Sequence, residues 1–228
     1  MIAVPVLTLD GPSGSGKGTV SRAVALALGW RLLDSGALYR LVALGARRAR
    51  IALEDAPAIS NLAEQIDIGF GSGEAGQEIV WLGGRDVTRD IRTEEAGNEA
   101  SKVAAIPAVR AALLERQRRF AVPPGLVADG RDMGTVVFPL AQVKIFLTAS
   151  PAERAQRRHK QLKEKGVTAT LAALSLEIAE RDRRDITRSA SPLVASADAI
   201  LLDTTGMSVD AVVERVLDIA RRRLSSGV

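Results

Sequence analysis

The sequence contains no cysteine among its 228 residues and only one histidine, His159. Without thiols the chain can form no disulfide framework, no zinc–thiolate site and no cysteine nucleophile. A single histidine within a basic stretch supports neither a catalytic histidine relay nor a metal triad. Only 3% of the residues are aromatic, which leaves few platforms on which nucleic-acid bases could stack. These absences exclude disulfide scaffolds and thiol enzymes, and they disfavour nucleic-acid binding.

Long uncharged runs are also absent. No run approaches the about 18 apolar residues that a membrane helix needs. No basic region precedes the first apolar run, as a signal peptide would require. We therefore expect a cytoplasmic protein with no membrane partner.

The charge balance is basic, with a net charge of +4 and a sequence pI near 9.8. The basic residues are spread along the chain and weighted toward arginine. Arginine suits bidentate recognition of phosphate groups. Small phosphorylated ligands account for this balance at least as well as DNA or RNA does, so we expect no nucleic-acid partner.

The most informative motif is a glycine-rich loop between an apolar run at 3–9 and an alanine- and leucine-rich run at 20–28. These flanks predict a buried strand and a helix. Glycines let the backbone N–H groups converge on a phosphate, the helix N-terminus adds partial positive charge, and a lysine adds a full charge. The order strand, loop, helix predicts a nucleotide-phosphate site. The loop residues are Gly11, Pro12, Ser13, Gly14, Ser15, Gly16, Lys17, Gly18 and Thr19.

The loop departs from the simplest phosphate-loop pattern directly after Lys17. That pattern has Ser or Thr there, and its hydroxyl holds Mg²⁺. Here Gly18 takes the position and the hydroxyl follows one residue later, on Thr19.

The rest of the chain alternates predicted strands and helices, which predicts an α/β protein with a parallel sheet and helices on both faces. Runs of β-forming residues at 66–70 and 78–82, with glycine-rich turns at 71–76 and 83–84, predict a small antiparallel sheet inserted into it. The further predicted strands are at 31–33, 126–128, 143–147 and 199–202. The further predicted helices are at 37–50, 54–65, 107–120, 151–165, 170–188 and 208–224, and one more helix is predicted to begin after Thr93 as its cap.

Polar clusters follow three of the predicted parallel strands. They are the glycine loop, the segment from Asp34 to Arg40, and Asp129 to Asp132. Each alone is compatible with an ordinary turn. Since ligands bind outside the carboxyl ends of parallel strands, three such clusters favour one shared cleft.

The predicted helix at 170–188 carries an apolar stripe that becomes charged. Leu171, Leu174 and Ile178 continue at helical spacing as three charged residues, Arg181, Asp185 and Arg188. Two interpretations remain open. Either the charges face a ligand, or the end of the helix emerges into solvent with i,i+4 pairs on its surface.

These motifs together resemble one family, the bacterial cytidylate kinases within the nucleoside monophosphate kinases. The matching segments are 11–19, 32–40, 128–139 and 181–185, with the Pro192–Leu193 pair. The resemblance covers essentially the whole chain, including an insert near 60–100 that is typical of the bacterial members. The order of Gly18 and Thr19 is also similar to this kinase group, so the departure noted above supports the resemblance.

The resemblance implies a P-loop NTPase-type parallel sheet flanked by helices, with a small antiparallel-sheet insert that binds the nucleoside monophosphate (NMP) and a helical lid. We expect a single unit over residues 1–228. Its core would comprise 1–59, 102–150 and 189–228, its NMP-binding insert about 60–101 and its lid about 151–188.

The resemblance also implies the reaction, which is transfer of the γ-phosphate of ATP to CMP or dCMP with Mg²⁺ present. The glycine loop would hold ATP, and Asp129 would orient Mg²⁺ through water. The implied catalytic residues are Lys17, Arg131, Arg157 and Arg158, of which the last two belong to the closing lid.

The implied acceptor site has three parts. Arg40 and Arg131 would grip the acceptor phosphate. Ser35, Arg110, Asp132 and Arg188 match positions that line the cytosine pocket, and Ser101, Arg181 and Asp185 match positions around the sugar. We expect a monomer that binds these small molecules.

Two alternatives remain. One is a P-loop kinase of another small acceptor, such as UMP or shikimate. A hydroxyl acceptor such as shikimate would need an aspartate base, and Asp34 or Asp129 could supply it. A phosphate acceptor has a second pKa near 6 and needs no base. The other alternative is a nucleotide-dependent protein that binds nucleic acid through its basic helices.

Overall fold

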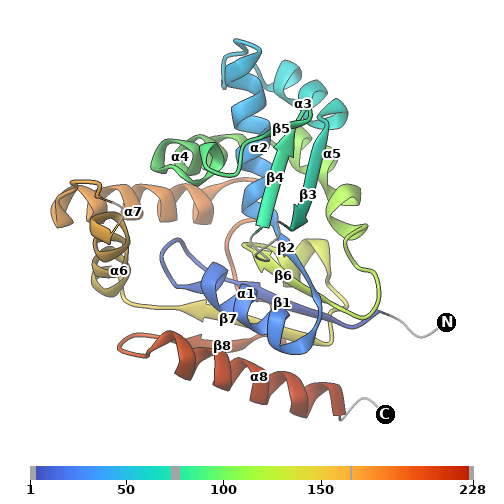
Figure 1. Cartoon of the computed structure of the whole chain (residues 1–228), viewed down its shortest axis with the longest axis vertical. Coiled ribbons are helices and arrows are strands. Elements are labelled where there is room, and N and C mark those ends of the chain that lie inside the picture. The colour runs from blue at the N-terminus through green and yellow to red at the C-terminus, as the bar shows by residue number, and fades with distance from the viewer. Residues whose placement is uncertain (1–3, 73–77, 165, 226–228) are drawn as a thin grey trace. The chain divides into compact units, whose positions relative to one another are not determined.

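The computed structural model describes residues 4–72, 78–164 and 166–225 (Figure 1). The chain divides into two compact units. The first comprises residues 1–34 and 117–228, and the second comprises residues 35–116.

The first unit is built on a five-stranded parallel sheet in the order β2-β6-β1-β7-β8. All five residues of the central strand β1 are buried, as expected for a strand covered on both faces. In the register, Asp10 lies opposite Gly130 and Phe146, so the polar ends of β1 and β6 coincide. The strands are β1 (Val6–Asp10), β2 (Arg31–Asp34), β6 (Leu126–Gly130), β7 (Val143–Thr148) and β8 (Ile200–Asp203).

Two helices of the first unit, α1 (Lys17–Leu28) and α8 (Val209–Ser225), pack against each other and the sheet (Figure 1). They share an apolar core in which Val20 and Val24 of α1 join Val212 and Val216 of α8. This core anchors α1, and with it the loop that precedes it.

The remaining elements of the first unit follow the carboxyl ends of β6 and β7. The single π-helical turn Met133–Val137 follows β6 and contacts β1. Helices α6 (Pro151–Glu164) and α7 (Leu171–Thr187) follow β7 and pack against each other. The hydroxyl of Thr170 caps α7 by accepting from the backbone N–H of Ala173.

The second unit combines helices with a three-stranded antiparallel sheet in the order β3-β4-β5. Trp81 packs over Gly69 and Gly71, where a Cβ atom on Gly71 would lie only 2.7 Å from the indole ring. The elements are α2 (Ser35–Arg48), α3 (Ala56–Gln65), β3 (Ile68–Ser72), β4 (Glu78–Leu82), β5 (Arg85–Asp86), the 3₁₀ turn Asp90–Arg92, α4 (Glu94–Val103) and α5 (Pro107–Arg118), whose last residues belong to the first unit.

The predicted fold class is confirmed, because a parallel sheet flanked by helices is accompanied by a small antiparallel sheet. The predicted helix at 37–50 is α2, which begins two residues earlier, at Ser35. Of the predicted turn at 71–76, residues 71–72 belong to β3 and the others lie outside the described residues. The predicted boundaries of core, insert and lid remain predictions. Within the described ranges, no helix is long and apolar enough to cross a membrane.

Candidate active site

The glycine loop is closely packed between β1 and α1. A Cβ atom on Gly11 would collide with the backbone carbonyl oxygen of Leu147, the penultimate residue of β7. Gly14 has a φ of +77°, which L side chains rarely adopt, and its Cβ position lies 3.1 Å from the Cβ of Arg154. The buried hydroxyl of Ser15 donates to the carbonyl of Pro12 at 3.0 Å. The packing therefore requires glycine at positions 11 and 14 and holds the loop in one shape.

Lys17 opens α1 among charged side chains of both signs. Its pKa is lowered to about 7, chiefly by burial and also by the charges of Arg131 and Arg181, while Asp129 and Asp34 act in the opposite direction. The carboxylates therefore only partly offset the cost of burying the protonated lysine. The phosphates of a nucleotide supply further negative charge, which is the electrostatic signature of an anion site.

Asp10 is an acidic member of the site that the sequence analysis did not identify. Its buried carboxylate accepts from the backbone N–H groups of Met133 and Gly134, both at 2.8 Å, and so anchors the π-helical turn. The pKa of Asp10 is raised to about 7, chiefly by burial and also by the carboxylates of Asp132 and Asp129, against the effect of these two hydrogen bonds. The available signal was its position at the carboxyl end of β1, directly before the glycine loop.

The raised pKa of Asp10 predicts a pH dependence of stability. Between pH 3.8 and about 7 the folded chain keeps a proton that the unfolded chain releases. The contribution of Asp10 to the free energy of unfolding is thus full at low pH and is lost as the pH rises through 7. Asp10→Asn removes the titrating group, so the decline in stability from about pH 5 to about pH 7 should become shallower.

Urea denaturation of the wild type and of Asp10→Asn at both pH values measures this effect. Asp210→Asn, at an exposed position in α8, is the matched control and should keep the wild-type slope. If the free energy of unfolding of Asp10→Asn declined as steeply with pH as that of the wild type, Asp10 would not be the titrating group.

The Asp129 carboxylate lies beside Gly18, the position at which the simplest phosphate-loop pattern has Ser or Thr. A Cβ atom on Gly18 would lie 3.3 Å from the Oδ2 atom of Asp129, so a larger residue at position 18 would press on this carboxylate. Carboxylate oxygens are hard ligands of the kind Mg²⁺ prefers, and Mg²⁺ is held through few protein ligands with water and phosphate oxygens. A cation would also relieve the repulsion among Asp10, Asp129 and Asp132. These residues fit a magnesium ion, although no cluster of three potential metal ligands occurs in the part of the chain that the structure describes.

The charged end of α7 faces inward. Asp185 is buried, and its Oδ2 atom accepts from the Nε of Arg131 at 2.9 Å. Burial would raise the pKa of Asp185, but Arg131, with Arg181 and Arg188, lowers it below its ordinary value. Arg188 is also buried, 4.0 Å from the Oδ1 of Asp132, and donates to the carbonyl of Ser191. The burial of Asp185 and Arg188 contradicts emergence into solvent, although Leu171 at the start of the stripe is exposed. That these charges face a ligand remains a prediction.

The second unit holds the other four predicted substrate residues, Ser35 and Arg40 on α2, Ser101 on α4 and Arg110 on α5. Ser35, Ser101 and Arg110 are buried. Arg110 donates to the carbonyl of Ala104 at 3.2 Å, and its guanidinium lies over the Tyr39 ring, 5.4 Å from the centroid. Helices α2 and α4, which carry three of these residues, pack against each other within this unit.

The predicted lid arginines differ in their contacts. Arg158 donates to the side chain of Gln161 at 3.1 Å. Arg157 pairs with Glu153 and donates to the carbonyl of Ser15 in the glycine loop. The preceding arginine on the same helix, Arg154, is almost completely buried and also contacts the loop. Arg154 was not predicted as a site residue, because nothing in a basic helical stretch marks one arginine as buried.

A parallel sheet, a glycine loop after its first strand and a lysine that opens the next helix define a P-loop nucleotide-binding fold. The family model described as Cytidylate kinase matches residues 7–222. The chain is 54% identical to the cytidylate kinase of Chromobacterium violaceum over 99% of its length and 100% of that protein. It is 56% identical to that of Marinomonas sp. over 93% of both. The chain belongs to the cytidylate kinase family, whose members are ATP-dependent nucleoside monophosphate kinases.

The likeness to solved structures is lower. TT1252 from Thermus thermophilus covers 97% of this chain and 98% of its own, with 20% identity and a TM-score of 0.47. The resemblance stated from the motifs is confirmed by the family match and the curated relatives.

Proposed function

We propose that this protein transfers the γ-phosphoryl group of ATP to CMP or dCMP, giving ADP and CDP or dCDP. Beyond family membership, the observation that best supports this reaction is that a cation of the donor loop lies near a cation of the predicted acceptor site. Lys17 belongs to the donor loop and Arg131 to the predicted acceptor site, and Arg131 is close enough to lower the pKa of Lys17. A cation from each of these two segments can stabilise the negative charge of a phosphoryl group that is transferred from ATP to the acceptor phosphate.

In the proposed reaction, an oxygen of the acceptor phosphate forms a bond to Pγ as the bond between Pγ and the bridging oxygen of ADP breaks. The acceptor oxygen is already ionised, so no general base is needed. Lys17, Arg131, Arg157 and Arg158 would neutralise the phosphate charges and hold the two nucleotides in line. Mg²⁺, oriented by Asp129 through water, would supply further neutralisation of the ATP phosphates.

The acceptor roles follow the same proposal. Arg40 would join Arg131 at the acceptor phosphate, and Arg181 would join Ser101 and Asp185 at the sugar. For the base, the buried pair of Asp132 and Arg188 offers both an acceptor and donors. Cytosine carries an amine donor and ring acceptors, which such a pair can recognise. Ser35 and Arg110 would complete the cytosine pocket.

The proposal includes a cytoplasmic monomer with no nucleic-acid partner. Its domains would be the core, NMP-binding insert and lid at the boundaries predicted from the sequence. Size-exclusion chromatography with light scattering measures the oligomeric state, and retention on RNA or DNA at physiological salt measures nucleic-acid binding.

Separate assays with CMP, dCMP, UMP, AMP and shikimate test the reaction, each with ATP and Mg²⁺ and with ADP release measured against ATP alone. We expect turnover with CMP or dCMP and identification of the diphosphate product by chromatography. Turnover with UMP or shikimate in the absence of any with CMP or dCMP would contradict the proposal and favour the alternative kinase.

A further inference from the structure

Arg154 connects three segments of the first unit that lie far apart in the sequence. Its side chain is only 5% exposed. Its Nε donates to the carbonyl of Ala149 at 3.1 Å, and one terminal nitrogen donates to the carbonyl of Ser13 at 3.0 Å. The other terminal nitrogen forms an ion pair of 2.6 Å with Asp182 of α7. A buried guanidinium thus joins the end of β7, the glycine loop and α7.

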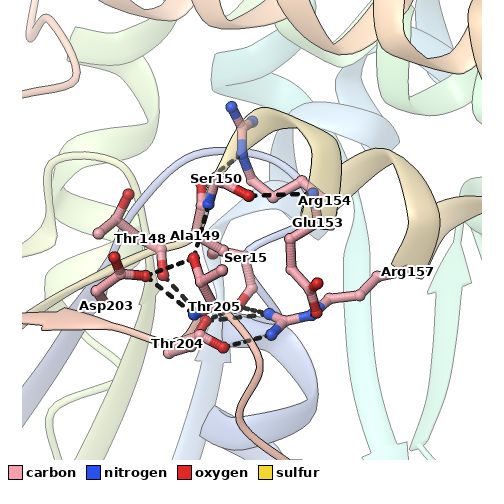
Figure 2. A network of polar contacts seen from close by, with 10 residues as sticks. All are labelled: Ser15, Thr148, Ala149, Ser150, Glu153, Arg154, Arg157, Asp203, Thr204 and Thr205. Atoms are coloured by element: carbon pink, nitrogen blue, oxygen red, sulfur yellow. Dashed lines mark hydrogen bonds and ion pairs between the residues drawn. The ribbon is translucent and has the colours of Figure 1, made fainter.

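Arg157, one helical turn further along α6, makes a second contact of the same kind. It donates to the carbonyl of Ser15 at 3.2 Å and to both the hydroxyl and the carbonyl of Thr204, at 3.0 and 2.5 Å. The Thr204 hydroxyl in turn donates to the carbonyl of Thr148. Figure 2 shows this network, with Arg157 directed toward Ser15 and Thr204. Two arginines of α6 therefore hold two carbonyls of the loop, at Ser13 and Ser15.

Holding these carbonyls determines the direction of the neighbouring amides. In a planar trans peptide unit, the C=O of one residue and the N–H of the next point in opposite directions. An arginine that fixes the Ser13 carbonyl therefore directs the Gly14 N–H away from α6, and fixing the Ser15 carbonyl does the same for the Gly16 N–H. Amides directed in this way are the donors with which glycine loops bind phosphate.

We propose that Arg154 is a positioning residue for the donor nucleotide, because it holds the Ser13 carbonyl and so orients the Gly14 N–H toward the ATP phosphates. This inference rests on the proposed function. Asp182 completes the arrangement, since it neutralises and orients the buried guanidinium. Arg154 acts through the backbone of the glycine loop, so its replacement should change the binding of ATP and leave the binding of the acceptor nucleotide unchanged.

Arg154→Lys tests this role. Lysine keeps the positive charge, but a single ammonium group cannot reproduce the planar fork that reaches three partners. Steady-state kinetics gives the KM values for ATP and CMP, and calorimetry gives the affinity for a non-hydrolysable ATP analogue with no acceptor present. Misplaced loop amides should raise the ATP KM and the analogue Kd about tenfold and leave the CMP KM within about twofold.

Arg221→Lys is the matched control, because it makes the same exchange at an exposed arginine of α8 and should leave all three constants unchanged. Unchanged ATP constants in a folded Arg154→Lys would overturn the inference. So would an equal rise in both KM values, because a general loss of structure does not distinguish the two nucleotides.

A second variant keeps the inference testable if Arg154→Lys does not fold. Asp182→Asn leaves the guanidinium and its two carbonyl acceptors in place and removes only the ionic partner. We expect the analogue Kd to rise about threefold, and an unchanged Kd would overturn the inference. If the wild type binds the analogue but does not phosphorylate CMP, the proposed function fails, while the analogue affinities still decide the role of Arg154.

Discussion

Lys17→Ala is expected to lower kcat about a thousandfold, because it removes a positive charge from the position where the transferred phosphoryl group develops negative charge. The structure adds a second expectation. Burial and the charges of Arg131 and Arg181 disfavour the protonated lysine, as its lowered pKa indicates. Removing it should therefore cost no stability at neutral pH, and the loss of activity should occur in a protein that is fully folded.

Coupled-assay kinetics and urea denaturation of the same preparation measure these two effects. Lys160→Ala removes a lysine from an exposed position of α6 and should change neither quantity. Turnover within about tenfold of the wild type would contradict the role of Lys17 in the transition state. A large loss of stability would contradict the electrostatic description of Lys17.

Asp185→Ala is expected to raise the KM for CMP and to lower the free energy of unfolding by about 3–5 kcal/mol. The first effect follows from its proposed contact with the sugar. The second follows from the ion pair with Arg131, since removing a buried partner leaves the other charge without compensation. Because the pKa of Asp185 is lowered, its contribution to stability is present above pH 3.8 and is lost as the pH falls through the lower folded value.

Asp218→Ala is the matched control for Asp185→Ala. Asp218 also pairs with an arginine, at 3.4 Å, but the pair is exposed on α8 and its loss should cost less than about 1 kcal/mol. Kinetics at saturating ATP measures the acceptor KM, and denaturation measures stability. An unchanged acceptor KM would count against the sugar role of Asp185, and a stability loss no larger than that of Asp218→Ala would show that Arg131 is compensated elsewhere.

The α7 helix shows where sequence reasoning reached its limit. The spacing of Arg181, Asp185 and Arg188 placed them on one stripe, because a helical period is a local property. Whether that stripe faces inward depends on what packs against the helix. The partner of Asp185 is Arg131, 54 residues away in the sequence, and no pattern within the helix specifies that pairing.

Asp10 and Arg154 show the same limit for single residues. The phosphate loop was predictable because its glycines, its lysine and its flanking strand and helix are contiguous, so local backbone geometry carries the function. Asp10 acquires its role from the amides of Met133 and Gly134, and Arg154 from a carbonyl 141 residues earlier in the chain. Burial and long-range hydrogen bonds create these roles, and both are properties of the folded chain.

The sequence alone therefore determined the class of fold, the phosphate loop and the family, because each depends on the order of neighbouring residues. Tertiary structure alone decided which charges are buried and which arginines hold the loop. The parallel pairing of β1 with β6 also brings the Asp129 carboxylate to the loop, where a Cβ atom on Gly18 would lie 3.3 Å from its Oδ2 atom. The physical reason is that the free energy of a charge depends on its solvent exposure and its partners, and both are set by residues distant in the chain.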